Sequence, residues 1–151
     1  MKWLAAASCL LASLAGAAEL TREQAHYVYL MAHAESGLPL PAEAPEIRVV
    51  PESRLQELIC PGQNCRMVGA EVGGIIYIRD DVDFSQPRAL LILAHEAVHY
   101  MQNKARGGGA KSCEEWMERE RQAFAVEMRL AQKANLETLS IMGAMNQLRC
   151  R

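Results

Sequence analysis

The stretch "LLILAHEAVHYMQ", residues 90–102, carries three ionisable side chains inside an otherwise apolar run. They are His95, Glu96 and His99, which spell H-E-x-x-H. The apolar flanks predict a helix that is mostly buried, and burying these three groups without partners would cost several kcal/mol. An ordinary pair of surface histidines is the alternative explanation, but the flanks favour a buried site that a metal ion stabilises.

The spacing of the two histidines suits zinc. Residues four apart lie on one face of a helix, so His95 and His99 direct two imidazoles to one point, as two of the three protein ligands of a catalytic Zn²⁺. Zinc lowers the pKa of a bound water towards about 7. Glu96 lies where its carboxylate can take the proton of that water and pass it to the leaving amine.

The third ligand has to come from another helix. One class of H-E-x-x-H proteins uses a histidine six residues after the second one, following a glycine. Those positions hold Ala105 and Gln102 here, which excludes that arrangement. The other class takes a glutamate from the next helix, which we expect to run from Cys113 to about Lys133.

Two glutamates fall in the middle of the apolar face of that next helix. At about 100° per residue, the face is defined by Trp116, Ala123, Phe124, Leu130 and Ala131. Glu120 and Glu127 lie two turns apart, roughly 10 Å, so both cannot bind one ion. We expect Glu120 to be the ligand because it lies nearer the preceding loop, and Glu127 to orient a ligating histidine. Alternatively, one or both pair with arginine or lie between helices.

H-E-x-x-H followed one helix later by E-x-x-A, here Glu120-Arg121-Gln122-Ala123, resembles the gluzincin branch of zinc metallopeptidases. The chain is also similar to a group of short secreted bacterial proteins with the same zincin core. This similarity is specific across about residues 74–131. It implies a minimal zincin-like α+β fold, in which a small sheet packs on the active-site helix and further helices follow.

The resemblance also implies roles for particular residues. His95, His99 and Glu120 would bind the metal, with Glu96 as the general base. The segment "GGIIYIRDD", residues 73–81, would form an edge strand above the active-site helix and pair with an extended peptide substrate.

Unlike the larger gluzincins, this protein is expected to have no sizeable C-terminal domain that could supply a Tyr or His to stabilise the oxyanion. Tyr77, Tyr100, His26 and His33 are the candidates for this role. A surface helix face is the alternative explanation for His26 and His33, which are seven residues apart. We expect the cleft to be open, or to be completed by a partner protein.

The first 17 residues are typical of a signal peptide. Lys2 supplies the positive charge, residues 3–14 an apolar run too short for a membrane span, and residues 15–17 a small-residue cleavage site. This predicts a periplasmic or secreted protein. Lipidation at Cys9 is the alternative.

Removing the signal peptide leaves four cysteines, Cys60, Cys65, Cys113 and Cys150. An even number in an oxidising compartment predicts two disulfides. We expect Cys60–Cys65 across the short "CPGQNC" turn and Cys113–Cys150 between the last helices. A zinc–cysteine site is the alternative, but the chain lacks a second closely spaced cysteine pair.

We expect residues 18–151 to form a single domain, because no repeat or long linker divides them. Half of the chain is hydrophobic, enough for a core, and a net charge of -2 predicts no general attraction to nucleic acid or anionic membrane. The expected elements are a helix opened by a Thr21–Gln24 capping box, a strand at "EIRVV", a short helix at "PESRLQELI", two strands turning at Gly73-Gly74, the H-E-x-x-H helix from about Gln86 to about Lys104 with Ser85 as N-cap, a helix opened by a Ser112–Glu115 capping box, and a last helix capped by Asn135.

Two functions fit this sequence. The first is an exported zinc endopeptidase that cleaves peptides or cell-envelope proteins. The second is a non-catalytic binding or structural protein of zincin-like fold, in which zinc only holds the helices together.

Overall fold

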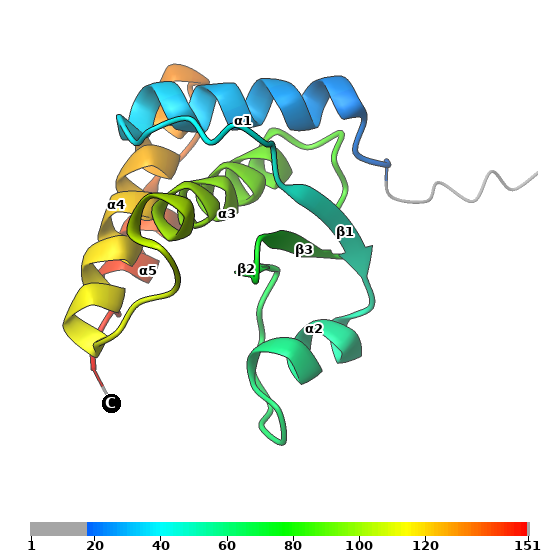
Figure 1. The fold of residues 1–151 in the computed structure, drawn as a ribbon. Helices are drawn as coiled ribbons and strands as arrows, with labels where there is room; N and C mark the ends of the chain where they lie inside the picture. Colours follow the sequence, from blue (N-terminus) through cyan, green and yellow to red (C-terminus); the bar gives the residue numbers. More distant parts are fainter. Residues whose placement is uncertain (1–17, 151) are drawn as a thin grey trace, which may run out of the picture.

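The computed structural model describes residues 18–150, so the expected signal peptide and Cys9 lie outside the described residues. In this part the chain forms five helices and three strands, which confirms the α+β class (Figure 1). None of these helices has the length and apolar character needed to cross a membrane. In chain order the elements are α1 (Arg22–Ser36), β1 (Glu46–Val50), α2 (Glu52–Ile59), β2 (Gly69–Val72), β3 (Ile75–Arg79), α3 (Pro87–Arg106), α4 (Cys113–Lys133) and α5 (Leu139–Asn146).

The sheet has the strand order β1–β3–β2. β1 runs parallel to β3, and β2 pairs with β3 in the antiparallel direction. The expected turn at Gly73-Gly74 is confirmed, and both glycines have positive φ angles, 62° and 90°. Residues without a Cβ adopt such angles at little cost, which explains the Gly-Gly pair between the two strands.

The expectation that residues 73–81 form an edge strand is wrong. β3 is the central strand, and the edges are β1 and β2. Ile76 and Ile78 of β3 are fully buried, so this strand is covered as well as paired on both sides. The parallel pairing with β1 joins segments far apart in the sequence, and local apolar patterning does not encode such a partner.

α3 lies at the centre of the fold, with α1 above it, α4 on one side and the sheet on the other (Figure 1). From Leu91 to Gln102 every residue except Ile92 and His99 is buried. A helix covered on several sides needs apolar residues around most of its circumference. This is why the stretch that contains H-E-x-x-H has so few polar positions.

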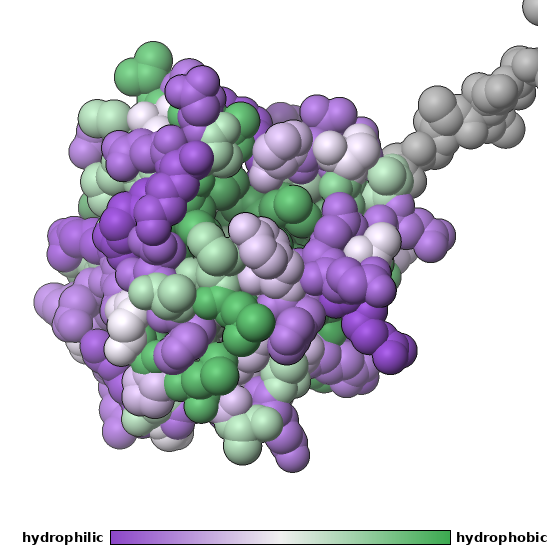
Figure 2. Space-filling model, turned by 90° about the horizontal axis from the view of Figure 1, so that it is seen from above, coloured by the Kyte–Doolittle hydropathy of each residue, from purple (hydrophilic) through white to green (hydrophobic). Residues whose placement is uncertain are grey.

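The face above α1 is mostly polar, with apolar side chains exposed between the polar ones (Figure 2). Tyr27 and Leu30 of α1 are among the exposed large hydrophobic residues. A cavity of about 470 Å³ lies between α1, β1 and α3, and its lining is mainly apolar. It contains none of the three metal-ligand candidates.

Two helix starts were predicted from capping boxes. The Thr21–Gln24 box of α1 is complete. At the start of α4, Ser112 accepts a hydrogen bond from the backbone N–H of Glu115 at 3.1 Å, as expected. The Glu115 carboxylate, however, accepts from the N–H of Lys111 at 2.8 Å, so only half of that box is formed.

Two other predicted caps are wrong. Gln86, and not Ser85, occupies the N-cap of α3, because Pro87 is the first helical residue. α5 begins after Thr138, and Asn135 instead adopts a φ of 55° just beyond α4. Asparagine tolerates this left-handed conformation better than most residues, so its role is to end one helix and not to begin the next.

Both expected cysteine pairs are at disulfide distance. Cys60–Cys65 closes the loop after α2, and Cys113–Cys150 joins the first residue of α4 to the segment after α5. The two cross-links therefore hold different parts of the molecule: one holds the segment between α2 and β2, and the other holds the terminal helices.

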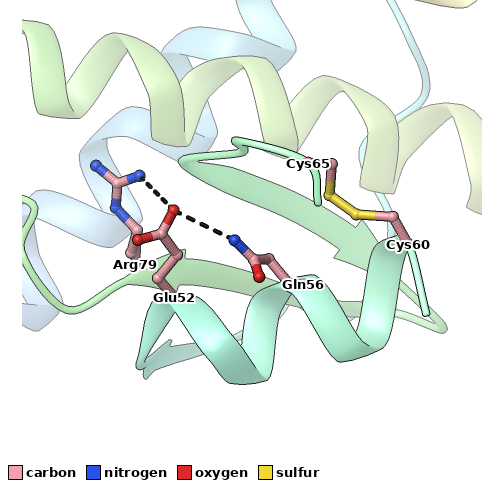
Figure 3. Close-up of a disulfide and its surroundings, with 5 residues drawn as sticks. All are labelled: Glu52, Gln56, Cys60, Cys65 and Arg79. Carbon is pink, nitrogen blue, oxygen red and sulfur yellow. Dashed lines mark hydrogen bonds and ion pairs between the residues drawn. A yellow bond between two sulfur atoms is a disulfide. The ribbon is translucent and has the colours of Figure 1, made fainter. Parts of the chain in front are cut away.

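An ion pair attaches the start of α2 to the sheet. The Glu52 carboxylate accepts from Nε2 of Gln56 at 3.4 Å and lies 3.8 Å from Nη1 of Arg79 on β3 (Figure 3). α2 is thus held near its start by an ion pair to the sheet and followed at its end by the Cys60–Cys65 loop.

Candidate metal centre

Three side chains predicted as metal ligands converge in the structure. Nε2 of His95 lies 3.1 Å from Nε2 of His99 on the same face of α3. The carboxylate of Glu120 on α4 lies 3.3 Å from the first of these nitrogens and 3.2 Å from the second. These ligand atoms all lie within 4.8 Å of one another, so the three residues are suitably placed to hold one metal ion.

Glu127 contacts the ring nitrogen of His95 that faces away from the other candidate ligands, as the helical spacing predicted. Its Oε2 lies 3.1 Å from Nδ1 of His95. An ionised carboxylate can only accept, so Nδ1 carries the proton and Nε2 keeps its lone pair for a metal. Glu127 is partly buried and lies seven residues, about two helical turns, beyond Glu120. α4 therefore supplies both the candidate ligand and the supporting group.

His99 has a support that sequence reasoning missed. Its Nδ1 lies 2.9 Å from Oε1 of Gln102, a fully buried residue. Nε2 of Gln102 donates to the backbone oxygen of Arg119 at 3.0 Å and to Oε1 of Gln122 at 2.9 Å. These two acceptors fix the amide orientation, so Oε1 faces the ring and His99 also presents an unprotonated Nε2. The available signal was the three-residue spacing from His99 on a buried helix.

The donor set fits a cation. Two imidazole lone pairs and a carboxylate face one point, and no hydrogen-bond donor lies between them when both Nδ1 atoms carry the protons. Three acceptors so close together repel one another unless a positive charge lies among them. Two nitrogens and one oxygen are also the ligand types that catalytic zinc sites use.

In the absence of a metal, a proton provides that positive charge. Burial disfavours the charged form of His95, but the hydrogen bonds that its ring donates to Glu120 and Glu127 outweigh burial and raise the pKa of His95 to about 10. Burial also opposes ionisation of Glu120, yet its hydrogen bonds to the two histidines lower its pKa to about 2. The pair is therefore held together as a charged imidazole and a carboxylate.

Glu96 lies beside the three ligand candidates without belonging to them. It is 7% exposed, and burial raises the pKa of its carboxyl group above the usual value. A Cβ atom on Gly69 of β2 would lie only 3.1 Å from Cγ of Glu96. The edge strand β2 therefore lies against the predicted general base, and a side chain at position 69 would require Glu96 and Ile78 to shift.

These groups line a cleft of about 250 Å³ beneath α3. On its helical side are His95, His99, Glu96 and Glu120, and on its other side are Ile59, Met67 and Ala70. An adjoining pocket of about 220 Å³ shares Glu71, Asn103 and Gly109 with the cleft and extends to the Gly73-Gly74 turn. The combined groove borders β2, which is an edge strand.

None of the four residues predicted as oxyanion donors lines the 250 Å³ cleft, although Tyr100 lines the adjoining pocket. The hydroxyl of Tyr100 donates to the backbone oxygen of Glu43 at 2.8 Å. Nδ1 of His33 lies 2.8 Å from the backbone oxygen of Leu38, so this ring is committed locally. His26 lines the separate 470 Å³ cavity, and Tyr77 lies on the central strand. These positions depend on the tertiary packing of α1 and β3, which residue type alone does not indicate.

A buried arginine that sequence reasoning did not single out lies at the edge of the cleft. Arg119 is 4% exposed and donates to Glu115 at 2.5 Å, to Oδ1 of Asn103 at 2.6 Å and to the backbone oxygen of Gly108 at 2.9 Å. Asn103 in turn donates to the Glu71 carboxylate. This chain of contacts joins α4, α3, the glycine loop and the edge strand β2.

No protein-family model, curated protein or solved structure matches this chain.

Proposed function

We propose that this protein is an exported zinc-dependent endopeptidase with a minimal zincin-like fold. One observation carries the proposal: His95, His99 and Glu120 present three acceptor atoms to one point beside the buried carboxylate of Glu96. Two disulfide-distance cysteine pairs and the lack of a membrane-spanning helix in residues 18–150 are compatible with secretion.

The bound zinc would supply Lewis-acid activation of a water molecule and of the scissile carbonyl. Glu96 takes a proton at its carboxylate and delivers it to the leaving nitrogen, and its raised pKa brings it closer to the range in which such exchange is efficient. Glu127 and Gln102 keep the protons on the Nδ1 atoms of the histidines, which leaves both Nε2 atoms free to bind the metal.

We propose that the substrate lies along β2. This strand is an edge of the sheet, and the groove beside it contains the candidate metal ligands. An extended peptide can pair with an exposed strand through backbone hydrogen bonds, whatever its side chains are. The same role cannot belong to β3, whose two sides are already paired.

The test of this function is Glu96→Gln. The substitution removes the base and leaves the ligands, so zinc content should stay at one ion per chain while cleavage of a peptide library falls by about 10²- to 10⁴-fold. Glu23→Gln, at an exposed position on α1, is the matched control and should change neither quantity. Undiminished cleavage by the Glu96 variant would contradict the proposed mechanism.

The second candidate, a structural zinc without turnover, is favoured by the positions of the predicted oxyanion donors. None of the four lines the 250 Å³ cleft, and Tyr100, which lines the adjoining pocket, donates its hydroxyl to the backbone oxygen of Glu43. On this alternative, chelation lowers the melting temperature strongly, but a broad peptide library stays uncut after zinc is restored. Cleavage by the zinc-loaded protein decides between the two functions.

A further inference from the structure

The segment before α1 is held by the loop that leads from β3 into α3. The N–H of Phe84 in this loop donates to the backbone oxygen of Ala18 at 3.1 Å, and Nε2 of Gln24 on α1 donates to the backbone oxygen of Phe84 at 3.3 Å. Phe84 is 2% exposed and belongs to the main hydrophobic core. Two segments far apart in the sequence therefore lie side by side at this end of the molecule (Figure 1).

The nitrogen of Ala18 faces a carboxylate of the same loop. It lies 3.1 Å from Oδ1 of Asp83, which also accepts from the backbone N–H of Ser85 at 3.0 Å. Oδ2 of Asp83 accepts from Nε2 of Gln86, the N-cap residue of α3, at 3.4 Å. Asp83 thus connects Ala18 to the start of the helix that carries the candidate metal ligands.

The Asp83 carboxylate is charged at neutral pH. Its hydrogen bonds with Ser85, followed by the one from Ala18, lower its pKa to about 2. An anion held in this way is a suitable partner for a cation at the position of the Ala18 nitrogen.

The expected signal-peptide cleavage would create such a cation. Residues 15–17 are typical of a cleavage site, so we expect the bond between Ala17 and Ala18 to be hydrolysed. One water is consumed when this C–N bond breaks. Its oxygen ends in the new carboxylate of Ala17, and its two protons join the nitrogen of Ala18, which becomes an ammonium group with a usual pKa of about 7.7–8.0. A neutral amide with one donor is thereby replaced by a cation with three.

We propose that the new N-terminal ammonium group of Ala18 forms an ion pair with Asp83, which fastens the N-terminus of the mature protein to the start of α3. The precursor cannot form this ion pair, because its Ala18 nitrogen is an uncharged amide. The attachment of residue 18 to the metal-ligand helix is therefore completed by processing. This inference rests on export in the proposed function, and not on zinc binding or peptide cleavage.

The position of the new N-terminus is the first measurement. The full-length chain is expressed in a secreting bacterium, and the N-terminus of the exported protein is determined by mass spectrometry. We expect it to be Ala18. An uncleaved chain, a lipidated Cys9 or any other first residue overturns the proposal.

A double-mutant cycle tests the ion pair itself. Two forms of residues 18–151 are released from a cleavable fusion, one that begins at Ala18 and one with a single glycine before it. The glycine turns the Ala18 nitrogen back into an amide and moves the charge away. At equal zinc content, the glycine form of the wild-type sequence should melt about 1–4 °C lower, a small shift because the site is partly exposed to solvent. In Asp83→Asn the two forms should melt at the same temperature.

Asp80→Asn, at an exposed position in the same loop, is the matched control and should keep the full difference between the two forms. High salt should shrink that difference in the wild-type sequence, because it screens the two charges. If Asp83→Asn fails to fold, Asp83→Ser takes its place, since the serine hydroxyl can still accept from Ser85.

Equal melting temperatures of the two wild-type forms overturn the ion pair, and so does a difference that persists in the Asp83 variant. Both results leave the endopeptidase untouched, because neither measurement depends on catalysis. A difference that requires Asp83, in a protein that cleaves no peptide, supports the ion pair and contradicts the endopeptidase.

Discussion

The two walls of the cleft differ in how they are built. The helical wall, from α3 and α4, holds the candidate metal ligands and their supporting groups at spacings of three, four and seven residues. His95 and Gln102 are buried, and His99, Glu120 and Glu127 are partly buried. The other wall, from α2 and β2, contributes apolar and backbone groups and is held by the Cys60–Cys65 pair and by pairing with β3. On the proposed function, the first wall supplies the reacting groups and the second borders the bound peptide.

The largest effect should follow from removing a ligand on the helical wall. Glu120→Gln replaces a charged ligand by a neutral amide, so we expect zinc affinity to fall by more than about 100-fold and activity to be lost with it. Glu118→Gln, an exposed neighbour on the same helix, should change zinc affinity little. Isothermal titration with zinc measures both, and retained affinity in the Glu120 variant would exclude this residue as a ligand.

A smaller effect should follow from removing the support of His99. Gln102→Leu leaves the Nδ1–H of His99 without an acceptor, so zinc affinity should fall by about 10- to 100-fold, with a stability loss of about 1–3 kcal/mol. The visible absorption spectrum of the cobalt-substituted protein should also change. Gln132→Leu, at an exposed position on α4, is the control. An unchanged spectrum would show that Gln102 does not orient the ligand.

A change in the wall formed by α2 and β2 should lower catalysis and leave metal binding intact. In Gly69→Ala the new Cβ would lie 3.1 Å from Cγ of Glu96 and 2.9 Å from Cδ1 of Ile78, so Glu96 must move. We expect kcat to fall by about 10- to 100-fold with one zinc ion retained. Gly143→Ala on α5, where an added Cβ meets nothing within 4 Å, should have no effect. Loss of zinc in the Gly69 variant would mean that a change on β2 also disturbs the metal ligands, which would contradict this prediction.

The smallest effect is a change in the pH dependence of stability. In the metal-free protein the pKa of His95 is raised to about 10 from 6.5, so its contribution to stability is complete below about pH 6.5 and is lost as pH rises through about 10. The melting temperature of the chelator-treated protein should therefore fall between pH 6.5 and 9.5. Zinc competes with protons for the same nitrogens, so its stabilising effect should grow over this range.

His95→Gln is the control for that measurement, because it removes the titrating group and should flatten the fall. A metal-free melting temperature that rises with pH would contradict the assigned ion pair between His95 and Glu120.

Much of the helical wall could be predicted from sequence. His95 and His99 are four residues apart on one helix, and Glu120 and Glu127 share a face of the next, because helical geometry repeats regularly along the chain. Gln102 was accessible by the same rule but was missed, since glutamine is not an obvious partner of a ligating histidine. The Thr21–Gln24 box is local, as is the Cys60–Cys65 pair across its short turn. Cys113–Cys150 was the pair that remained among the four cysteines once that first pair was chosen.

The rest of the site could not be predicted in this way. β3 was expected at the edge and is central, because β1 pairs with it from a distant part of the sequence. Tyr77, Tyr100, His26 and His33 have suitable chemistry, but their positions depend on how α1 and the sheet pack on α3. Arg119 was not singled out because its burial results from contacts with Asn103 and Gly108, which lie on other elements.

The sequence by itself determined the α+β class, the helices that carry the candidate ligands, and the face on which each ligand lies, because backbone hydrogen bonding imposes a fixed period on nearby residues. Only the tertiary structure decided which strand borders the cleft, that Trp116, Ile59 and Met67 line it together, and that none of the predicted oxyanion donors lines the 250 Å³ cleft. These outcomes depend on contacts between segments distant in sequence, which arise from packing a whole core at once and not from any local pattern.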